Sequence, residues 1–240
     1  MPASETLRQA FALGALELHG QFMLGSNYTF LVRIRHEGQV FQGVYKPKRG
    51  EQPLWDFPEN SLAHREVAAY LVSEALGFGI VPYTTLREDG PYGPGSLQQY
   101  IEYNPNYHYF NFTEEDKARL SIVALFDHLT NNADRKGSHV FFEKRTRHLY
   151  AIDHGLCFHE EDKLRTVIWD FAGQPLPEEY LLALGDLRQA LATGSLRTDL
   201  LDHLSAEEVD ALDARAQALI AGGIFPLPPV GRRAFPYPPL

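Results

Sequence analysis

The chain has 240 residues, of which 44% are hydrophobic and 22% charged, and this composition excludes bulk disorder and a fibrous coiled coil. Its net charge is −9, from 22 basic and 31 acidic residues, so the acidic balance disfavours binding to nucleic acid or to an anionic membrane. No apolar run approaches the length of a membrane span, no secretory signal pattern opens the sequence, and the single cysteine, Cys157, excludes an internal disulfide, so we expect a cytoplasmic protein.

The first part of the chain is rich in strand signals and contains one strong helix. Residues 5–13 can form a short helix, and residues 22–46 are predicted to form an antiparallel hairpin with strands at 28–34 and 40–45. After a loop over residues 50–60, Ser61 can cap a helix whose apolar positions keep helical spacing until Gly77. Two more short strands are predicted over residues 80–86 and 96–101.

The second part of the chain is mainly helical. Thr113 opens a helix predicted to run to about Leu129, residues 140–143 and 148–152 make a small hairpin, and Ser205 starts a capping box before a helix that ends at Gly222. Residues 225–240 contain six prolines and predict an extended strap or a loose tail.

This order of elements predicts an α+β fold with two lobes. Residues 1–102 form the expected β-rich N-lobe, residues 103–224 the helical C-lobe, and residues 225–240 a proline-rich tail. A cleft between two such lobes is a common ligand site.

Two polar loops flank the small predicted hairpin, and each carries an acid: Asp134 in the loop over residues 131–139 and Asp153 in the loop over residues 153–155. Acids placed in this way can converge on one point. Phosphoryl transfer needs such a pair, because one carboxylate orients or deprotonates the attacking hydroxyl and another holds a divalent metal on the phosphates. Either segment alone is equally well explained as an ordinary turn, and only their joint order and spacing favours the catalytic interpretation.

A lysine in the predicted N-lobe fits the same chemistry. Lys46 ends a strand and is followed by a helix that carries Glu66, so a carboxylate can hold the ammonium and offer it to a phosphate. We prefer Glu66 to Glu74 as the partner because it lies nearer the start of the helix. The alternative is a solvated lysine on an edge strand. The turn at residues 24–29 can lay backbone N–H groups over phosphates, and residues 98–102 can bond a flat heterocycle.

Taken together, these residues resemble the PI3/PI4-kinase-like branch of the protein-kinase-like fold, which includes phosphatidylinositol lipid kinases and the HipA-type bacterial kinases. The matching elements, in chain order, are Lys46, Arg65–Leu71 with Glu66, Ile80–Pro82, Asp134-Arg135 and Asp153-x-Gly155. More narrowly, the chain looks like a group of actinobacterial-type proteins related to PI3/PI4 kinases. The segments that carry this narrower likeness are Pro53–Pro58 and Lys163–Trp169, and the likeness is weak beyond Trp169.

The resemblance implies a two-lobed kinase-like fold and an ATP-dependent kinase that phosphorylates a hydroxyl. It implies that Asp134 is the catalytic base, that Asp153 is the main metal ligand, and that Glu66 holds Lys46 against the α- and β-phosphates. The implied nucleotide contacts are Ser26, Asn27 and Tyr28 over the phosphates and Gln98, Gln99 and Tyr100 at the adenine.

One position departs from the pattern of that branch. Its members carry an asparagine five residues after the catalytic aspartate, where this chain has His139. Because imidazole suits manganese better than magnesium, the expected cofactors are ATP with Mg²⁺ or Mn²⁺, and His139 is a candidate metal ligand. The alternatives are an enzyme that works with one well-held metal, a pseudokinase that binds nucleotide as a regulatory module, and an enzyme that transfers AMP.

Acceptor recognition in such folds usually falls in the segment after Asp-x-Gly, here residues 157–177. This segment mixes both charges and contains the acidic run Glu160–Asp162, whereas a kinase of membrane inositol lipids needs a basic patch. A protein hydroxyl or a small polar metabolite is therefore the expected acceptor.

Overall fold

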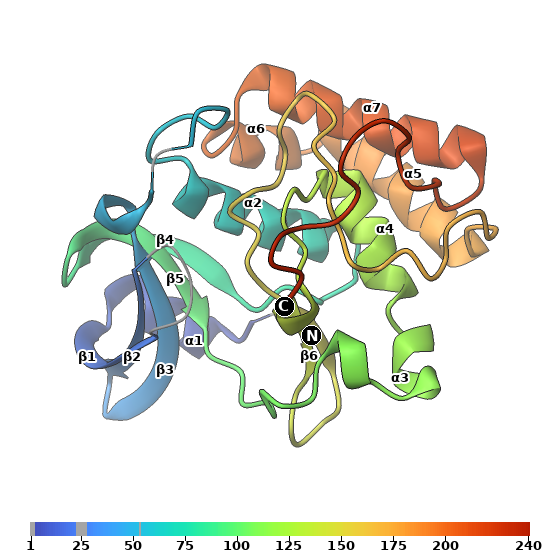
Figure 1. The fold of residues 1–240 in the computed structure, drawn as a ribbon. Helices are drawn as coiled ribbons and strands as arrows, with labels where there is room; N and C mark the ends of the chain where they lie inside the picture. Colours follow the sequence, from blue (N-terminus) through green and yellow to red (C-terminus); the bar gives the residue numbers. More distant parts are fainter. Residues whose placement is uncertain (1–2, 23–27, 53) are drawn as a thin grey trace.

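The structure, a computed structural model, describes residues 3–22, 28–52 and 54–240. Figure 1 shows a lobe built around one β-sheet beside a lobe of helices, with a small hairpin below them. The helices are α1 (Glu5–Leu13), α2 (Leu62–Ala75), α3 (Glu114–Ala118), α4 (Ser121–Thr130), α5 (Glu178–Thr193), α6 (Leu196–Leu201) and α7 (Ala206–Gly222). The strands are β1 (Ala15–Phe22), β2 (Thr29–His36), β3 (Gln39–Pro47), β4 (Thr84–Gly90), β5 (Gly93–Gln99), β6 (Val140–Phe142) and β7 (Leu149–Ala151). Short 3-10 turns lie at Lys48–Gly50, Tyr109–Asn111 and Gly137–His139.

The sheet of the N-lobe is antiparallel with the strand order β1-β2-β3-β5-β4. Alternate residues of β2, namely Phe30, Val32 and Ile34, are buried, as the two-residue period of a half-covered strand predicts. They pack with Phe11 of α1 in a separate apolar cluster. The register pairs Lys46 of β3 with Ser96 of β5, which fixes the lysine in a central strand.

The main core lies in the helical lobe and reaches up to α2. It combines buried residues of α2, α4, α5 and α7 with those of the β6–β7 hairpin. Helix α2 is buried over most of its surface because it lies between the sheet and the helical lobe. Residues on α2 are therefore held by both lobes at once.

Helix α2 begins where the sequence predicts, but its N-terminus is satisfied by a different residue. Ser61 makes no capping bond with its side chain, which instead donates to the Pro58 carbonyl. The carboxylate of Glu51 accepts from the backbone N–H groups of Leu62 and Ala63, at 3.2 and 2.9 Å. The predicted Ser61 cap is thus wrong, because the loop folds back and brings a charged acceptor to the same donors.

Three other element boundaries differ from the sequence prediction. The predicted hairpin over residues 22–46 is part of a three-stranded meander that starts at Ala15. The helix predicted from Thr113 to Leu129 is interrupted at Arg119 and Leu120 and forms α3 and α4. Strands β4 and β5 meet over residues 84–99, so the segment before Thr84 is not a strand. The predicted small hairpin and the Ser205 capping box are confirmed.

Residues 225–240 run back over the helical lobe as a strap, seen in red in Figure 1. The Phe225 carbonyl accepts from the N–H of Gly173, the Ala234 carbonyl from that of Thr166, and the Pro239 carbonyl from that of Gly137. The strap therefore crosses the segment after Asp153 and ends against the loop that contains Asp134.

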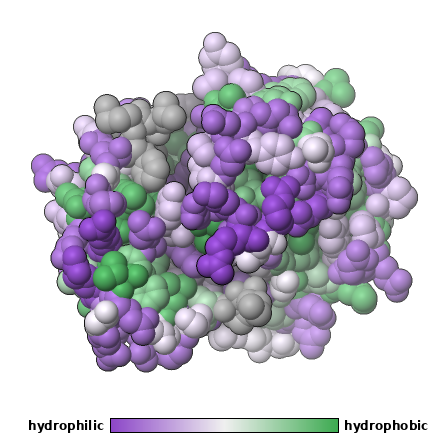
Figure 2. Space-filling view, turned by 90° about the horizontal axis from the view of Figure 1, so that it is seen from below, coloured by the Kyte–Doolittle hydropathy of each residue, from purple (hydrophilic) through white to green (hydrophobic). Residues whose placement is uncertain are grey.

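Figure 2 shows the face that is seen from below, where hydrophilic residues gather over the middle and hydrophobic areas are small and separated. None of the helices in the described residues is long and apolar enough to cross a membrane.

Candidate functional site

Lys46 joins two segments that are far apart in the chain. Its Nζ lies 2.5 Å from Oε1 of Glu66 on α2 and also pairs with Oδ1 of Asp153 in the loop after β7. Burial alone would lower the pKa of Lys46, but the two carboxylates outweigh it and raise this pKa above its ordinary value. Glu66, and not Glu74, is the partner of Lys46. The ammonium is therefore permanently charged and held between the lobes.

Glu66 is fixed from a second direction. Its other carboxylate oxygen accepts from the backbone N–H of His154 at 3.1 Å, and its side chain is almost fully buried. One carboxylate on α2 thus binds both the strand lysine and the loop that carries Asp153.

Asp153 combines an unusual backbone conformation with an accessible side chain. Its backbone lies in the left-handed region, with φ +62°, which is uncommon for a residue with a side chain and is frequent at functional turns. The side chain is 46% exposed, so it faces an accessible space. Desolvation works toward a higher pKa, but the ammonium of Lys46, helped by His139, holds the pKa of the Asp153 carboxyl well below its usual range. The carboxylate is ionised at any physiological pH.

His139 lies against the other oxygen of Asp153. Its Nε2 is 3.2 Å from Oδ2 of Asp153. Burial lowers the pKa of His139 to about 4, so the imidazole is neutral near pH 7. Its Nδ1 is buried without a hydrogen-bond partner within the described residues.

A fully buried network holds the two acidic loops together. The carboxylate of Asp127 on α4 accepts from Nε of Arg135 and from the amide of Asn132, at 3.0 and 3.1 Å. The Arg135 guanidinium then donates to the carbonyl of Ile152 at 2.7 Å and to Nε2 of His154 at 2.8 Å. Because Arg135 and Asp127 are completely buried and pair with each other, this network fixes the relative position of the loops at residues 131–139 and 152–155.

Asp134 lies between Asn132 and Arg135, two members of this network. Its backbone N–H donates to the side-chain oxygen of Asn132, and its Oδ2 is 3.4 Å from Nζ of Lys136. Burial raises the pKa of Asp134, and the charge of Asp153 acts in the same direction, whereas Lys136 and Arg165 oppose it. The charges of the two predicted acids therefore interact, and the carboxylate of Asp134 is the more basic of the two.

The structure describes only some of the residues that are predicted to contact the nucleotide. Ser26 and Asn27 lie outside the described residues. Tyr28 is 60% exposed at the start of β2. The side chain of Gln98 is buried and donates to the hydroxyl of Thr84 at 2.9 Å.

The backbone N–H groups at the end of β5 are also engaged. That of Gln99 donates to the Tyr83 carbonyl and that of Tyr100 to the Gln42 carbonyl. The next residue, Ile101, is buried, and its backbone has no hydrogen-bond partner within the part of the chain that the structure describes. Among the described residues, the backbone groups of Ile101 are thus uncommitted, whereas the N–H groups of Gln99 and Tyr100 are engaged within the protein.

Sequence reasoning did not identify several residues of this site. Asp127, which anchors the network, lies in an apolar helix and has no local signal. Lys136, beside Asp134, could have been found from its spacing of two residues from the acid. Arg165 is brought to the site by the fold alone.

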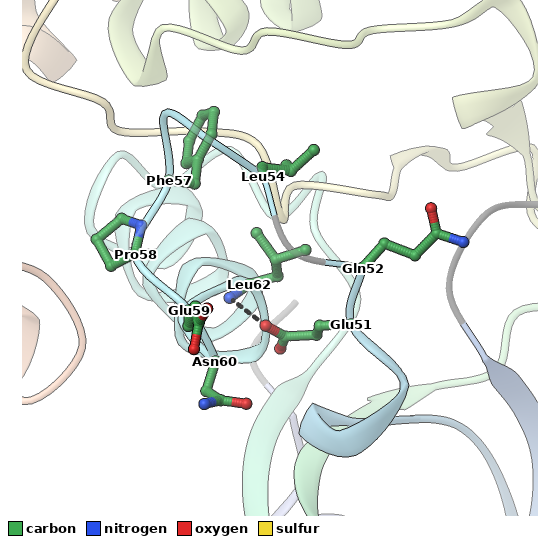
Figure 3. A pocket seen from close by; sticks show the side chains of 8 residues that line it. All are labelled: Glu51, Gln52, Leu54, Phe57, Pro58, Glu59, Asn60 and Leu62. Atoms are coloured by element: carbon green, nitrogen blue, oxygen red, sulfur yellow. Dashed lines mark hydrogen bonds between the residues drawn. The ribbon is translucent and has the colours of Figure 1, made fainter.

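The residues that line the pocket in Figure 3 include none of these charged groups, although Phe57 and Leu62 of its lining pack with Ala133 beside Asp134. The pocket is formed by the loop before α2 and has a volume of about 70 Å³. Its lining residues are Glu51, Gln52, Leu54, Phe57, Pro58, Glu59, Asn60 and Leu62. Sites for small molecules usually measure about 300–1,000 Å³, so this pocket is too small for a nucleotide.

The five-stranded sheet, the helical lobe and the Lys46–Glu66–Asp153 junction define a two-lobed kinase-like fold. Solved structures agree: the Helicobacter pylori proinflammatory kinase CtkA has a TM-score of 0.52 at 11% identity, over 90% of this chain and 94% of CtkA. Hydra Fam20 has a TM-score of 0.51 at 14% identity, over 91% of this chain and 89% of Fam20. At these identities the likeness shows the fold.

No model of a protein family matches the sequence. Protein Rv2133c of Mycobacterium tuberculosis is 38% identical over 260 aligned positions, which cover 94% of this chain and 92% of Rv2133c. The chain belongs to the family of Rv2133c.

Proposed function

We propose that the protein is an ATP-dependent phosphotransferase that transfers a phosphate to a hydroxyl. The observation that carries this proposal is the placement of Lys46 between Glu66 and Asp153, with Asp134 near enough for the charge of Asp153 to raise its pKa. Within this proposal, residues 1–102 form the N-lobe that covers the nucleotide, residues 103–224 form the C-lobe with the catalytic and metal loops, and residues 225–240 form a proline-rich tail. The relation to PI3/PI4 kinases is the finer part of the same proposal.

Lys46 binds the phosphates of the nucleotide. An ammonium has three N–H donors, and two of them are directed to Glu66 and Asp153. The third remains for a phosphate oxygen. Since both carboxylates hold the lysine in place, it loses little freedom when the nucleotide arrives.

Asp134 orients the acceptor hydroxyl and takes its proton. A raised pKa makes its carboxylate a better base than an ordinary surface acid, and Lys136 limits the build-up of negative charge beside it.

The residues around Asp153 fit a divalent ion. Adjacent ligands of an octahedral ion with bonds of about 2.1 Å lie about 3 Å apart, and Nε2 of His139 and Oδ2 of Asp153 are separated by 3.2 Å. A neutral imidazole together with a carboxylate suits Mn²⁺ better than Mg²⁺. His139 and Asp153 would hold such an ion, with the His139 side chain fixed by its burial, and the ion would supply positive charge to offset that of the phosphates.

A nucleotide-binding module without turnover is the second candidate. It is favoured by the contact of His139 with Asp153, because this pair can also be a hydrogen bond that blocks metal entry. For either function we place the protein in the cytoplasm, since its only cysteine is buried and unpaired.

The proposal is tested by incubating the protein with ATP and Mn²⁺ or Mg²⁺ and a panel of hydroxyl acceptors. We expect ATP consumption that Asp134→Asn abolishes, whereas Asp186→Asn on the exposed face of α5 leaves it unchanged. Mass spectrometry of the products separates a phosphate adduct from an AMP adduct. Nucleotide binding without consumption of ATP would favour the regulatory module.

A further inference from the structure

Arg165 lies in the segment after Asp153 and is attached to the catalytic loop by its backbone. Its N–H donates to the Asn132 carbonyl at 2.9 Å, and its carbonyl accepts from the N–H of Arg135 at 3.0 Å. A parallel bridge between Arg135 and Thr166 continues this contact. The position of Arg165 relative to Asp134 is therefore set by the fold and does not depend on a flexible loop.

The side chain of Arg165 turns toward the same loop. Its Nε donates to the carbonyl of Ala133 at 2.8 Å, and that carbonyl belongs to the peptide unit that joins Ala133 to Asp134. The terminal nitrogens Nη1 and Nη2 have no hydrogen-bond partner, and no carboxylate lies within 4.0 Å, among residues 3–22, 28–52 and 54–240. The guanidinium is thus fixed at one end and uncommitted at the other.

The other cations of this region are already paired. Lys163 contacts Asp56 and Glu161, and Arg232 pairs with Asp162. Two acids of the segment after Asp153, Glu161 and Asp162, are therefore paired with cations other than Arg165. Among the residues that the structure describes, the ammonium of Lys136 pairs only with Asp134, at the long distance of 3.4 Å.

A guanidinium presents its donors in a planar fork. With Nε bonded to Ala133, the four N–H groups on Nη1 and Nη2 remain, and they match two oxygens of a carboxylate or a phosphate. An anion bound there would lie beside Asp134 and would also interact with the ammonium of Lys136. Two cations would thus compensate its charge next to the position where phosphate is transferred.

We propose that Arg165 and Lys136 form an oxyanion subsite that holds an anionic group of the acceptor next to the hydroxyl presented to Asp134. The subsite takes a phosphate or carboxylate carried by the acceptor itself. This assignment rests on the proposed phosphotransferase function and narrows its acceptor to an anionic one.

Inorganic sulfate is the probe, because its binding requires no turnover. Calorimetric titration of sulfate is carried out on the full chain, with and without a saturating non-hydrolysable ATP analogue and Mn²⁺. We expect Arg165→Gln to weaken sulfate binding about tenfold, as expected for loss of a charge-assisted bidentate contact. Arg145→Gln is the matched control, because Arg145 is exposed on the β6–β7 turn and this substitution removes the same charge. Its sulfate affinity stays that of the wild type.

Arg165→Lys keeps the charge and loses the planar fork of donors, so we expect its sulfate affinity to lie between those of the wild type and Arg165→Gln. This second variant keeps the test valid if Arg165→Gln is poorly folded. Displacement of sulfate by glycerol 3-phosphate identifies a small phosphorylated acceptor, and displacement by a serine peptide flanked by aspartates identifies an acidic protein. Equal sulfate affinity in wild type and both Arg165 variants, or displacement by neither competitor, overturns the subsite. If sulfate binding depends on Arg165 but no nucleotide binds, the subsite is supported and only the phosphotransferase function is contradicted.

Discussion

Replacing Arg65 with methionine removes the charge that joins α2 to α7 while it keeps much of the side-chain volume. The Arg65 side chain is 1% exposed and that of its partner Glu208 is 12% exposed. The guanidinium also donates to the Cys157 carbonyl at 2.5 Å and to Oγ of Ser61 at 3.3 Å. The variant therefore leaves a mostly buried carboxylate without its counter-ion and a buried carbonyl without its donor.

Removal of one partner from a buried ion pair costs about 3–5 kcal/mol. Glu208 retains one bond, from the backbone N–H of Ser205 at 3.0 Å, because it also serves the capping box of α7. We therefore expect Arg65→Met to lower the free energy of unfolding by about 3 kcal/mol, the lower end of that range. Since α2 carries Glu66, nucleotide affinity should fall as well.

Equilibrium denaturation in urea, followed by circular dichroism, measures this loss. The control is Arg188→Met, which breaks the pair between Arg188 and Asp213, whose side chains are 36% and 35% exposed. An exposed pair is worth at most about 1 kcal/mol. If Arg65→Met lost no more stability than Arg188→Met, the inference that this ion pair anchors α2 to the helical lobe would be refuted.

Three further changes test other parts of the structure. His139→Asn should shift the preferred ion for nucleotide binding from Mn²⁺ toward Mg²⁺ in calorimetry, and an unchanged preference would remove His139 from the metal site. Glu51→Ala deprives two N–H groups of α2 of their acceptor and should lower the free energy of unfolding by about 1 kcal/mol, which an unchanged denaturation midpoint would contradict. Burial lowers the pKa of His128 from 6.5 to about 4, so the folded state disfavours protonation of this imidazole. The free energy of unfolding is therefore undiminished above about pH 6.5 and falls as the pH drops below that value. This loss reaches at most about 2 kcal/mol near pH 5, and His128→Gln should lose correspondingly less; equal losses in the two proteins would contradict the assignment.

The division into a sheet lobe and a helical lobe follows from local signals. Turn residues and two-residue periodicity place β2 and β3, and the capping residues Thr113 and Ser205 mark two helix starts correctly. The break between α3 and α4 leaves no such signal, because neither Arg119 nor Leu120 disfavours a helix. Local propensity cannot reveal a break that tertiary packing imposes.

Prediction of the candidate site from the sequence is limited in the same way, because its residues come from distant segments of the chain. The pairing of Lys46 with Glu66 is predictable from the sequence, because Lys46 ends a strand and Glu66 lies near the start of the helix that follows it. The anchor of the acidic loops, Asp127, and the uncommitted cation, Arg165, depend on contacts between distant segments that no local pattern encodes. The Ser61 cap failed for a related reason, since the carboxylate of Glu51 reaches the helix only through the fold of the loop.

Calorimetric titration with a non-hydrolysable ATP analogue, with and without Mn²⁺ or Mg²⁺, tests the central claim that Lys46 and Asp153 form a nucleotide–metal site. The proteins to compare are the wild type, Asp153→Asn and the control Asp170→Asn, whose carboxylate accepts only from the exposed hydroxyl of Tyr109 within the described residues. We expect the ion to strengthen nucleotide binding in the wild type and in Asp170→Asn but not in Asp153→Asn. Absence of nucleotide binding with either ion, or equal strengthening by the ion in Asp153→Asn, would contradict this claim.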